Sequence, residues 1–209
     1  TKNLDVWLMG TQELIESFTR NSKSDISIIE GVMGYYDGFG GKSNLASTHH
    51  VATLLTSPVI LILDASKTSR SIAATALGFT KFHKNSRISG IILNKIGSKK
   101  HEDLCRAALL NLKIPIIGVI PKNPSANLES RHLGLIPVRE QKDLHNKIRQ
   151  ISKDISDYLD FDLIEKICKT TSSLDKIKVV KTKKSKVSIA IALDNSFNFY
   201  YHDNIEALR

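Results

Sequence analysis

The chain has 209 residues, of which 41% are hydrophobic and 24% charged, and these proportions are ordinary for a globular protein. No apolar run approaches the roughly 20 residues that cross a bilayer. No signal peptide opens the sequence either, so we expect no membrane partner and a cytoplasmic location. The formal charge of +9 concentrates in the lysine-rich stretch 176–186, which lacks aromatic residues for base stacking. We therefore expect a solvated linker there and no nucleic-acid partner.

Short apolar runs rich in β-branched residues predict strands over 26–30, 58–64, 88–94 and 114–120. Helical patterns lie near 3–20, 44–56, 69–84 and 100–112, and Ser69 or Ser71 could cap the third of these helices. This alternation predicts an α/β fold with a mostly parallel sheet flanked by helices. Ligands of such sheets bind at the carboxyl ends of the strands, where Glu30, Asp64 and Asn94 fall.

The pattern changes after Pro124. A loop through Arg131 and His132 leads to helices near 139–158 and 160–169, then to the basic linker, and 187–193 predicts a new buried strand. One strand and the start of a helix cannot form a domain alone. We therefore expect one α/β domain over 1–169, a linker over 170–186, and the opening of a second domain over 187–209.

The segment Gly40-Gly-Lys-Ser43 looks like the end of a nucleotide-binding phosphate loop. That motif needs a glycine five positions before the second glycine, and Tyr36 stands there. The glycine matters because backbone amides must curl around the phosphates without a Cβ in the way. The sequence therefore predicts no phosphate loop in this chain. The cysteines, Cys105 and Cys168, are too few and too far apart for a metal knuckle or a disulfide framework.

An ordered series of motifs resembles the cobyrinic acid a,c-diamide synthase family over nearly the whole chain. The motifs are Asn3-Leu-Asp5, Glu30-Gly-Val-Met-Gly-Tyr-Tyr-Asp-Gly38, Asp64-Ala-Ser-Lys-Thr-Ser-Arg-Ser71, Gly90-Ile-Ile-Leu-Asn-Lys-Ile-Gly97, Ile117-Gly-Val-Ile-Pro121, Glu129-Ser-Arg-His-Leu-Gly-Leu135 and Ala192-Leu-Asp-Asn-Ser-Phe-Asn-Phe-Tyr-Tyr201. One such motif alone is weak, whereas the set in this order is specific.

The resemblance implies an ATP-dependent amidoligase, a ligase that joins carbon to nitrogen with glutamine as amido donor, in cobalamin or related cofactor biosynthesis. ATP with Mg²⁺ converts the a- and c-carboxylates of cobyrinic acid, its hydrogeno form or nickel-sirohydrochlorin into acyl phosphates, and glutamine-derived ammonia displaces the phosphate. It also implies a phosphate-loop NTPase fold, similar to dethiobiotin synthetase, followed by a glutaminase-like α/β domain. A homodimer stays open.

The resemblance also implies roles for individual residues. Glu30 is expected at the Mg²⁺ and phosphate site as a catalytic carboxylate, with a capping role for the next turn as the alternative. Asp37 is either catalytic or a plain turn residue. Asn94 is expected to read adenine, because its amide both donates and accepts, and Pro121 and Lys122 to form the other wall of that pocket; a plain turn at the strand end is the alternative for both.

A further group of residues is expected near phosphate or substrate. Ser69, Arg70 and Ser71 open a helix whose N-terminus suits an anion, with simple capping as the alternative. Arg131 and His132 match a loop near the family's active site or domain interface. Outside this group, Asp5 is expected to cap the first helix, with a place in the substrate site as the alternative, and His49 and His50 are expected to pack or lie on the surface rather than bind a ligand.

The family places a phosphate loop before the position of Thr1 and a glutaminase cysteine after that of Arg209, so we expect a central fragment that is inactive alone. A missing first strand predicts an exposed apolar edge, with poor stability or association. Two other functions stay open: a partitioning-type DNA-associated ATPase, which needs a phosphate loop, and a non-catalytic module related to dethiobiotin synthetase.

Overall fold

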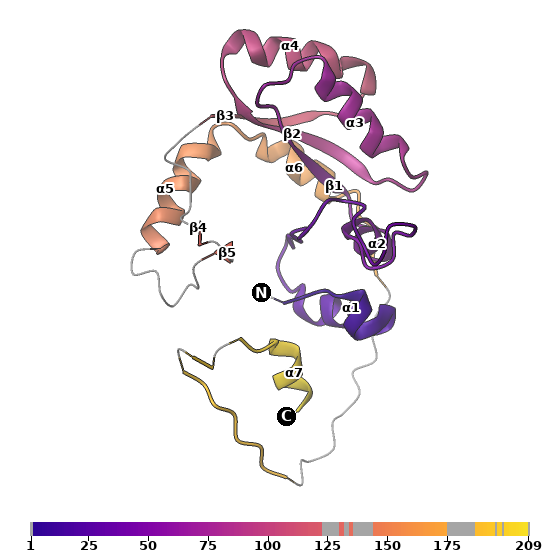
Figure 1. Ribbon diagram of the computed structural model, residues 1–209, viewed down its shortest axis with the longest axis vertical. Coiled ribbons are helices and arrows are strands. Elements are labelled where there is room, and N and C mark those ends of the chain that lie inside the picture. Colours follow the sequence, from indigo (N-terminus) through magenta and orange to yellow (C-terminus); the bar gives the residue numbers. More distant parts are fainter. Residues whose placement is uncertain are drawn as a thin grey trace. The chain divides into compact units, whose positions relative to one another are not determined.

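The computed structural model of the chain describes residues 2–122, 130–131, 134–135, 144–174, 187–194, 196–197 and 199–208 (Figure 1). The chain forms two compact units. One unit is Thr56–Thr171, and the other joins Thr1–Leu55 with Ser172–Arg209. The domain boundaries expected at 169 and 186 stay a prediction.

The unit over 56–171 is built on a parallel sheet of three strands, β1 (Val59–Asp64), β2 (Ile88–Ile96) and β3 (Ile116–Pro121), in the order β1-β2-β3. Helices α3 (Ser71–Lys81) and α4 (Lys99–Leu109) cover one face, and α6 (Phe161–Cys168) lies on the other (Figure 1). A short 3-10 helix, η1 (Leu110–Leu112), ends α4. This arrangement confirms the predicted α/β fold with a parallel sheet flanked by helices.

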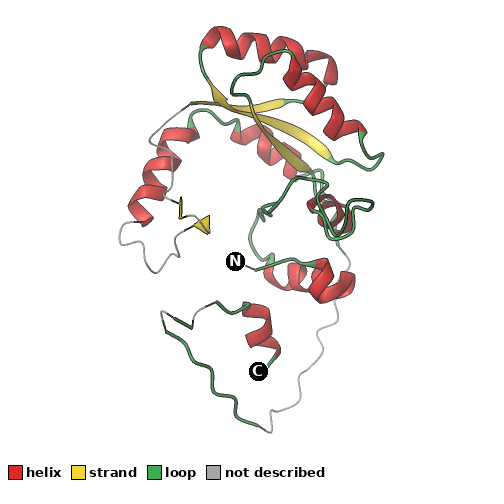
Figure 2. Cartoon of the chain, viewed as in Figure 1, coloured by secondary structure: helices red, strands yellow, loops and turns green. Residues whose placement is uncertain are grey.

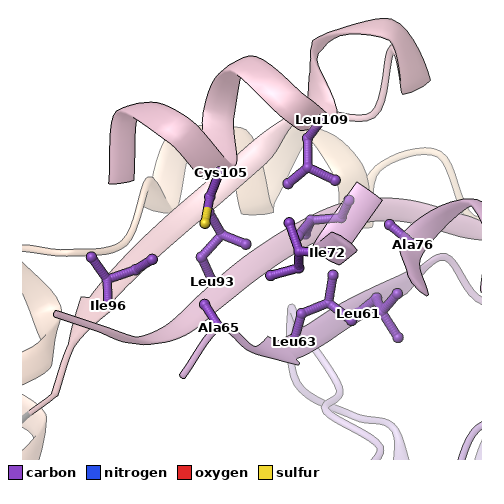
Figure 3. Packing of buried hydrophobic residues seen from close by; sticks show 10 residues of the cluster. Leu61, Leu63, Ala65, Ile72, Ala76, Leu93, Ile96, Cys105 and Leu109 are labelled. Carbon is purple, nitrogen blue, oxygen red and sulfur yellow. The ribbon is translucent and has the colours of Figure 1, made fainter. Parts of the chain in front are cut away.

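The core follows from the two-residue period of the strands. Leu61 and Leu63 of β1 and Leu93 of β2 point toward α3 and α4, whose inward side chains complete the cluster (Figure 3). Those helix residues include Ile72, Ala76, Cys105 and Leu109. The alternate face of β2 and β3 carries Ile92 and Ile117, which pack with Ile167 of α6. The strands thus carry apolar side chains on both faces of the sheet: α3 and α4 cover one face, and α6 covers the other.

The outer edge of β3 is occupied by the segment that joins α5 (Leu144–Ser156) to α6. Gly118 forms an antiparallel bridge with Leu159, and the Val119 N–H donates to the Tyr158 carbonyl at 3.0 Å. A Cβ on Gly118 would lie 2.5 Å from the Leu159 side chain, so this close approach requires glycine.

The other unit contains α1 (Val6–Asn21), α2 (Thr48–Leu54) and α7 (His202–Ala207). Asp5 caps α1 by accepting the backbone N–H groups of Trp7 and Leu8, which confirms the predicted capping. The core of this unit is small, consisting of Val6, Leu14, Val51 and Leu55 with partly buried neighbours. Lys2 pairs with Asp203 of α7 at 2.7 Å, and Ser17 of α1 donates to the same carboxylate.

Two predicted strands are wrong. Residues 26–30 and 187–193 are loops in the structure, without ladder partners among the described residues (Figure 2). Many of their apolar side chains are exposed to solvent: Ile28 is 92% exposed and Val187 is 72% exposed. A strand is defined by hydrogen bonds to a neighbour, so an apolar run without one stays a loop.

A short hairpin was not predicted. Strand β4 (Ser130–Arg131) pairs antiparallel with β5 (Gly134–Leu135), so Arg131 belongs to a strand and not to the expected loop. A two-residue strand is too short to leave an alternating apolar pattern in the sequence. His132 lies outside the described residues. Among the described helices, none has the length and apolar character needed to cross a membrane.

Candidate functional site

The loop that carries Glu30 and Asp37 folds on itself by local hydrogen bonds. Glu30 does not end a strand, as was predicted, but lies exposed in this loop. The Asp37 N–H donates to the Gly34 carbonyl at 2.9 Å, and the Gly34 N–H donates to Asp37 Oδ2 at 3.1 Å. Asp37 is therefore a turn residue in the structure, and its other carboxylate oxygen faces an exposed surface.

A buried aromatic cluster anchors this loop to α2. Tyr35 is buried and lies edge-on to His49, with ring centroids 5.4 Å apart, and Tyr36 lies 5.1 Å from the same imidazole. The His49 N–H donates to the Tyr35 carbonyl at 2.9 Å. His49 thus packs in the interior as predicted, while the two acidic residues on either side of Tyr35 stay exposed.

The Gly-Lys-Ser segment does not lead into a helix. Phe39 donates its N–H to the Leu45 carbonyl at 2.7 Å, which closes a loop around residues 40–44, and α2 begins only at Thr48. In a nucleotide-binding phosphate loop the lysine and the following hydroxyl residue open the helix, whose N-terminus faces the phosphates. The geometry of Lys42 and Ser43 agrees with the exclusion of a phosphate loop here.

The carboxyl edge of the sheet gathers the other predicted residues. Asp64, the last residue of β1, lies opposite Asn94 of β2. Pro121, the last residue of β3, pairs with Ile96, and the Lys122 N–H donates to the Ile96 carbonyl at 2.9 Å. Parallel strands therefore bring the ends of three separate segments to one edge, as predicted.

Asn94 does not end its strand, because β2 continues to Ile96. The continuation is irregular: Lys95 has a left-handed φ of 60°, and the register with β3 shifts between Leu93 and Ile96. Asn94 Oδ1 accepts the Lys95 N–H at 2.9 Å. This local bond uses the side-chain oxygen of Asn94 and leaves the amide nitrogen to donate.

Asp64 and Lys95 form an ion pair at this edge, with Lys95 Nζ 2.6 Å from Asp64 Oδ2. The hydrogen bond from Lys95, helped by the Ser66 N–H, holds the pKa of the Asp64 carboxyl far below its usual range. Both side chains are about half exposed, so solvent screens the pair and its contribution to stability is small. The pair does place a fixed negative and a fixed positive charge beside Asn94.

The start of α3 lacks a side-chain cap. The expectation that Ser69 or Ser71 caps this helix is wrong, since Arg70 is the N-cap residue and no cap bond forms from its side chain. Arg70 already has helical φ and ψ (−62° and −32°), and the Ser69 carbonyl accepts the Ile72 N–H at 3.2 Å. A capping side chain needs extended backbone at its own residue, and this turn is helical. The backbone N–H groups at this helix start therefore have no serine hydroxyl bound to them in the described structure.

Sequence reasoning did not identify two residues at this edge, Lys95 and His101. Lys95 directly follows Asn94, and Asp64 lies opposite Asn94, so parallel pairing of the two predicted strands could have revealed the ion pair between Asp64 and Lys95. His101 of α4 contacts Thr68, 33 positions earlier in the chain. Only Ser98, a visible cap three residues before His101, marks the start of that helix in the sequence.

The predicted site residues fall into the two units. Glu30 and Asp37 belong to the unit with α1 and α2, whereas the unit with the sheet carries the rest of the described set: Ser69, Arg70, Ser71, Asn94, Pro121 and Lys122. Only the backbone of Arg131 is described.

The acidic residues can be tested against Mg²⁺. Within the described ranges, no group of three or more His, Cys, Asp or Glu side chains could hold a metal ion. Mg²⁺ usually keeps several waters and binds one or two carboxylates together with nucleotide phosphates. An exposed carboxylate such as Glu30 therefore fits Mg²⁺ that arrives with a nucleotide, and the described residues offer no dedicated protein cage.

Comparison with known proteins gives one family and several close relatives. The AAA domain family matches residues 8–130. The chain is 39% identical to the cobyrinate a,c-diamide synthase of Synechococcus sp., over 100% of the chain and 47% of that protein. It is 42% identical to the Picrophilus torridus protein of the same name, over 100% of the chain and 48% of the relative.

The synthase of that name from Caldanaerobacter subterraneus is 39% identical over 99% of the chain and 46% of its own length. The chain thus spans about half the length of the curated relatives it matches. These names confirm the predicted resemblance. No solved structure matches the chain.

Proposed function

Since the chain belongs to the AAA domain family and matches cobyrinate a,c-diamide synthases over its whole length, we propose that it is part of such a synthase. The reaction is the amidation of the a- and c-carboxylates of cobyrinic acid, or of a related tetrapyrrole, in cobalamin or related cofactor biosynthesis. ATP and glutamine are the co-substrates. The carboxyl edge of the sheet, where Asp64 lies opposite Asn94 and Pro121 pairs with Ile96, is the observation that carries the proposal.

The chemistry requires activation of a carboxylate. A carboxylate is a poor electrophile, so its oxygen attacks the γ-phosphorus of ATP, the bond to the β,γ-bridging oxygen breaks, and an acyl phosphate and ADP result. Ammonia released from glutamine then attacks the acyl carbon and displaces phosphate, which leaves the amide. Phosphoryl transfer of this kind depends on positioning and on neutralising the charge of the phosphates. Mg²⁺, when bound with ATP, supplies part of that neutralisation.

The sheet edge is proposed to hold the nucleotide. Asn94 Oδ1 is already bonded to the Lys95 N–H, so its amide nitrogen is the group that donates to a ring nitrogen of adenine. Pro121 and Lys122 follow the neighbouring strand and supply the second wall. The start of α3, at Ser69, Arg70 and Ser71, offers backbone N–H groups and one guanidinium to phosphate or to a substrate carboxylate.

The exposed loop around Tyr35 is proposed to act on the metal and the substrate. Glu30 is the carboxylate that would hold Mg²⁺, and Asp37 is the nearby acid of the same loop. Tyr35, which is buried against His49, anchors this loop between the two carboxylates. Arg131 and His132 are proposed to lie near the substrate.

Glu30→Gln in the full-length protein that contains this chain tests the assignment. It removes the negative charge and keeps the size, so we expect ATP- and glutamine-dependent formation of the diamide to fall at least about 100-fold. Mass spectrometry of the corrinoid product and release of ADP measure this, and circular dichroism checks the fold.

The matched control is Glu13→Gln. Glu13 is an exposed residue of α1 that forms an ion pair with Arg20. This substitution should leave turnover unchanged. Wild-type turnover in Glu30→Gln would remove Glu30 from the mechanism, and absence of diamide from the unaltered full-length protein would contradict the proposed function.

A further inference from the structure

His101, in the first turn of α4, joins two loops at the carboxyl edge of the sheet. Its Nδ1 atom accepts the Gly97 N–H at 3.2 Å, and its Nε2 atom lies 2.5 Å from the Thr68 carbonyl oxygen. A carbonyl only accepts and an N–H only donates, so the proton of the imidazole must sit on Nε2. One neutral tautomer therefore satisfies both partners.

The two partners of His101 belong to the segments that the proposed nucleotide site is made of. Thr68 directly precedes Ser69 at the start of α3. Gly97 directly follows Ile96, whose carbonyl accepts the Lys122 N–H, and it lies three residues after Asn94. The imidazole thus links the loop after β1 to the loop after β2.

The loop before α3 has a conformation that needs support. Lys67 has a left-handed φ of 57°, and the Thr68 N–H and hydroxyl both donate to the Ala65 carbonyl at 3.2 Å. This tight turn directs the Thr68 carbonyl toward α4. A left-handed non-glycine residue costs free energy and persists only where surrounding contacts hold it.

A second donor approaches the same carbonyl from the interior. The Cys105 Sγ atom is fully buried and lies 3.9 Å from the Thr68 oxygen. Figure 3 shows the thiol pointing from α4 toward the sheet, near Leu93. Burial raises the pKa of this thiol, which keeps it as S–H. At 3.9 Å the thiol is a weak donor, so the shorter contact from His101 dominates.

We propose that His101 is a positioning residue of the ATP site: chiefly through its short hydrogen bond to Thr68, and to a lesser extent through the longer one from Gly97, it sets the two loops that flank the nucleotide. This inference rests on the proposed function. His101 does not touch the nucleotide; it acts through the backbone of residues 65–71 and 94–97. Its loss therefore weakens ATP binding more than it slows the chemical step.

Two substitutions separate the two hydrogen bonds of His101 in the full-length protein. His101→Gln places an amide nitrogen near the former Nε2 position and keeps a donor to Thr68. His101→Asn places an amide oxygen near the former Nδ1 position, keeping the acceptor for Gly97 and losing the bond to Thr68. We expect His101→Asn to raise KM for ATP about tenfold with a smaller change in kcat, and His101→Gln to stay within about threefold of wild type.

His83→Asn is the matched control. His83 Nδ1 also accepts a backbone N–H, from Asn85 at 3.2 Å, but it lies in the loop before β2, at the opposite end of the strand. This variant should leave KM for ATP unchanged. Calorimetric binding of a non-hydrolysable ATP analogue and the thermal midpoint are measured for every variant.

The outcomes distinguish the two proposals. If His101→Asn lowers the thermal midpoint but keeps the ATP affinity of wild type, or if His101→Gln is as impaired as His101→Asn, the positioning role is overturned. Should His101→Asn not fold, His101→Gln still tests the role, because it keeps the donor to Thr68; a KM for ATP raised about tenfold or more in a folded His101→Gln overturns the role. An unaltered protein that neither binds ATP nor forms diamide contradicts the proposed function and the role of His101 with it.

Discussion

Lys95 adopts a backbone conformation that lysine rarely takes. Its φ of 60° lies in the left-handed region, and it stands inside β2 between Asn94 and Ile96. For a residue with a Cβ this conformation costs about 1–2 kcal/mol. The half-exposed ion pair with Asp64 offsets little of that cost. Such strain is typical of residues that are kept for a function of the backbone or of the side chain.

We expect Lys95→Gly to raise the stability of the unit that carries the sheet by about 0.5–1 kcal/mol, because glycine tolerates a positive φ. Lys95→Ala is the control, since it loses the same ion pair and keeps the Cβ. Urea unfolding followed by circular dichroism measures the difference. A glycine variant no more stable than the alanine variant would show that the backbone at Lys95 carries no strain.

Single residues were predicted best where their role depends on the neighbouring sequence. The capping of α1 by Asp5 follows from its position just before a helical pattern, and the packing of His49 follows from its place within one. The expected cap at Ser69 or Ser71 failed because the turn there is already helical, and a sequence does not display φ and ψ. The contact of His101 with Thr68 depends on how two crossovers pack, which no local pattern contains.

At the scale of elements, the segment before α6 carries several interactions at once. Asp160 caps α6 by accepting the Leu163 N–H at 2.9 Å, and its own N–H donates to the Ile117 carbonyl of β3 at 2.8 Å. The helix cap and the pairing at the edge of β3 therefore share one residue. Ile167 of the same helix covers the second face of the sheet.

Asp160→Ala should lower the free energy of unfolding by about 1 kcal/mol, since it removes the cap. Asp160→Asn keeps an oxygen acceptor at the same place and should lose much less. Both variants retain the backbone bond to Ile117, so a comparison of their thermal midpoints isolates the side chain. Equal loss in both variants would mean that the negative charge, and not the capping oxygen, stabilises α6.

The five apolar runs that predicted strands look alike in sequence, yet only three became strands. Residues 59–64, 88–96 and 116–121 find one another through crossover helices of ordinary length, whereas 26–30 and 187–193 pair with no described segment. Composition and periodicity report burial, but a strand also needs a neighbour far along the chain. Helices α1, α2, α3, α4 and α6, whose hydrogen bonds are local, were predicted to within a few residues at their ends, whereas the expected start near 139 lies outside the described residues.

At the scale of the whole molecule, large apolar side chains lie exposed on both units. They include five in the loop before Gly34 and one on the face of β1: Ile26, Ile28, Ile29, Val32, Met33 and Ile62. Ile62 is 62% exposed, although its neighbour on the same face of the sheet, Ile92, is buried. Large apolar side chains that stay exposed in this way are typical of an interface.

We expect the 209-residue chain, when produced alone, to self-associate through these exposed apolar side chains. Ile62→Lys should shift the distribution toward the monomer by adding a charge on the exposed face of β1. Leu110→Lys, at a comparably exposed position on η1, is the control and should change the distribution less. Sedimentation velocity over a range of concentrations measures the masses. A monomer at every concentration for the unaltered chain would refute this expectation.

The bridge between Gly118 and Leu159 restricts the side on which the described sheet can be extended by another strand. Because the stretch from Tyr158 to Asp160 occupies the outer side of β3, a further parallel strand can join the described sheet only beside β1. A strand that joins in parallel there must finish next to Asp64, with Asn94 one strand farther on. The last residue of such a strand would therefore lie close to the charged side chains of Asp64 and Lys95.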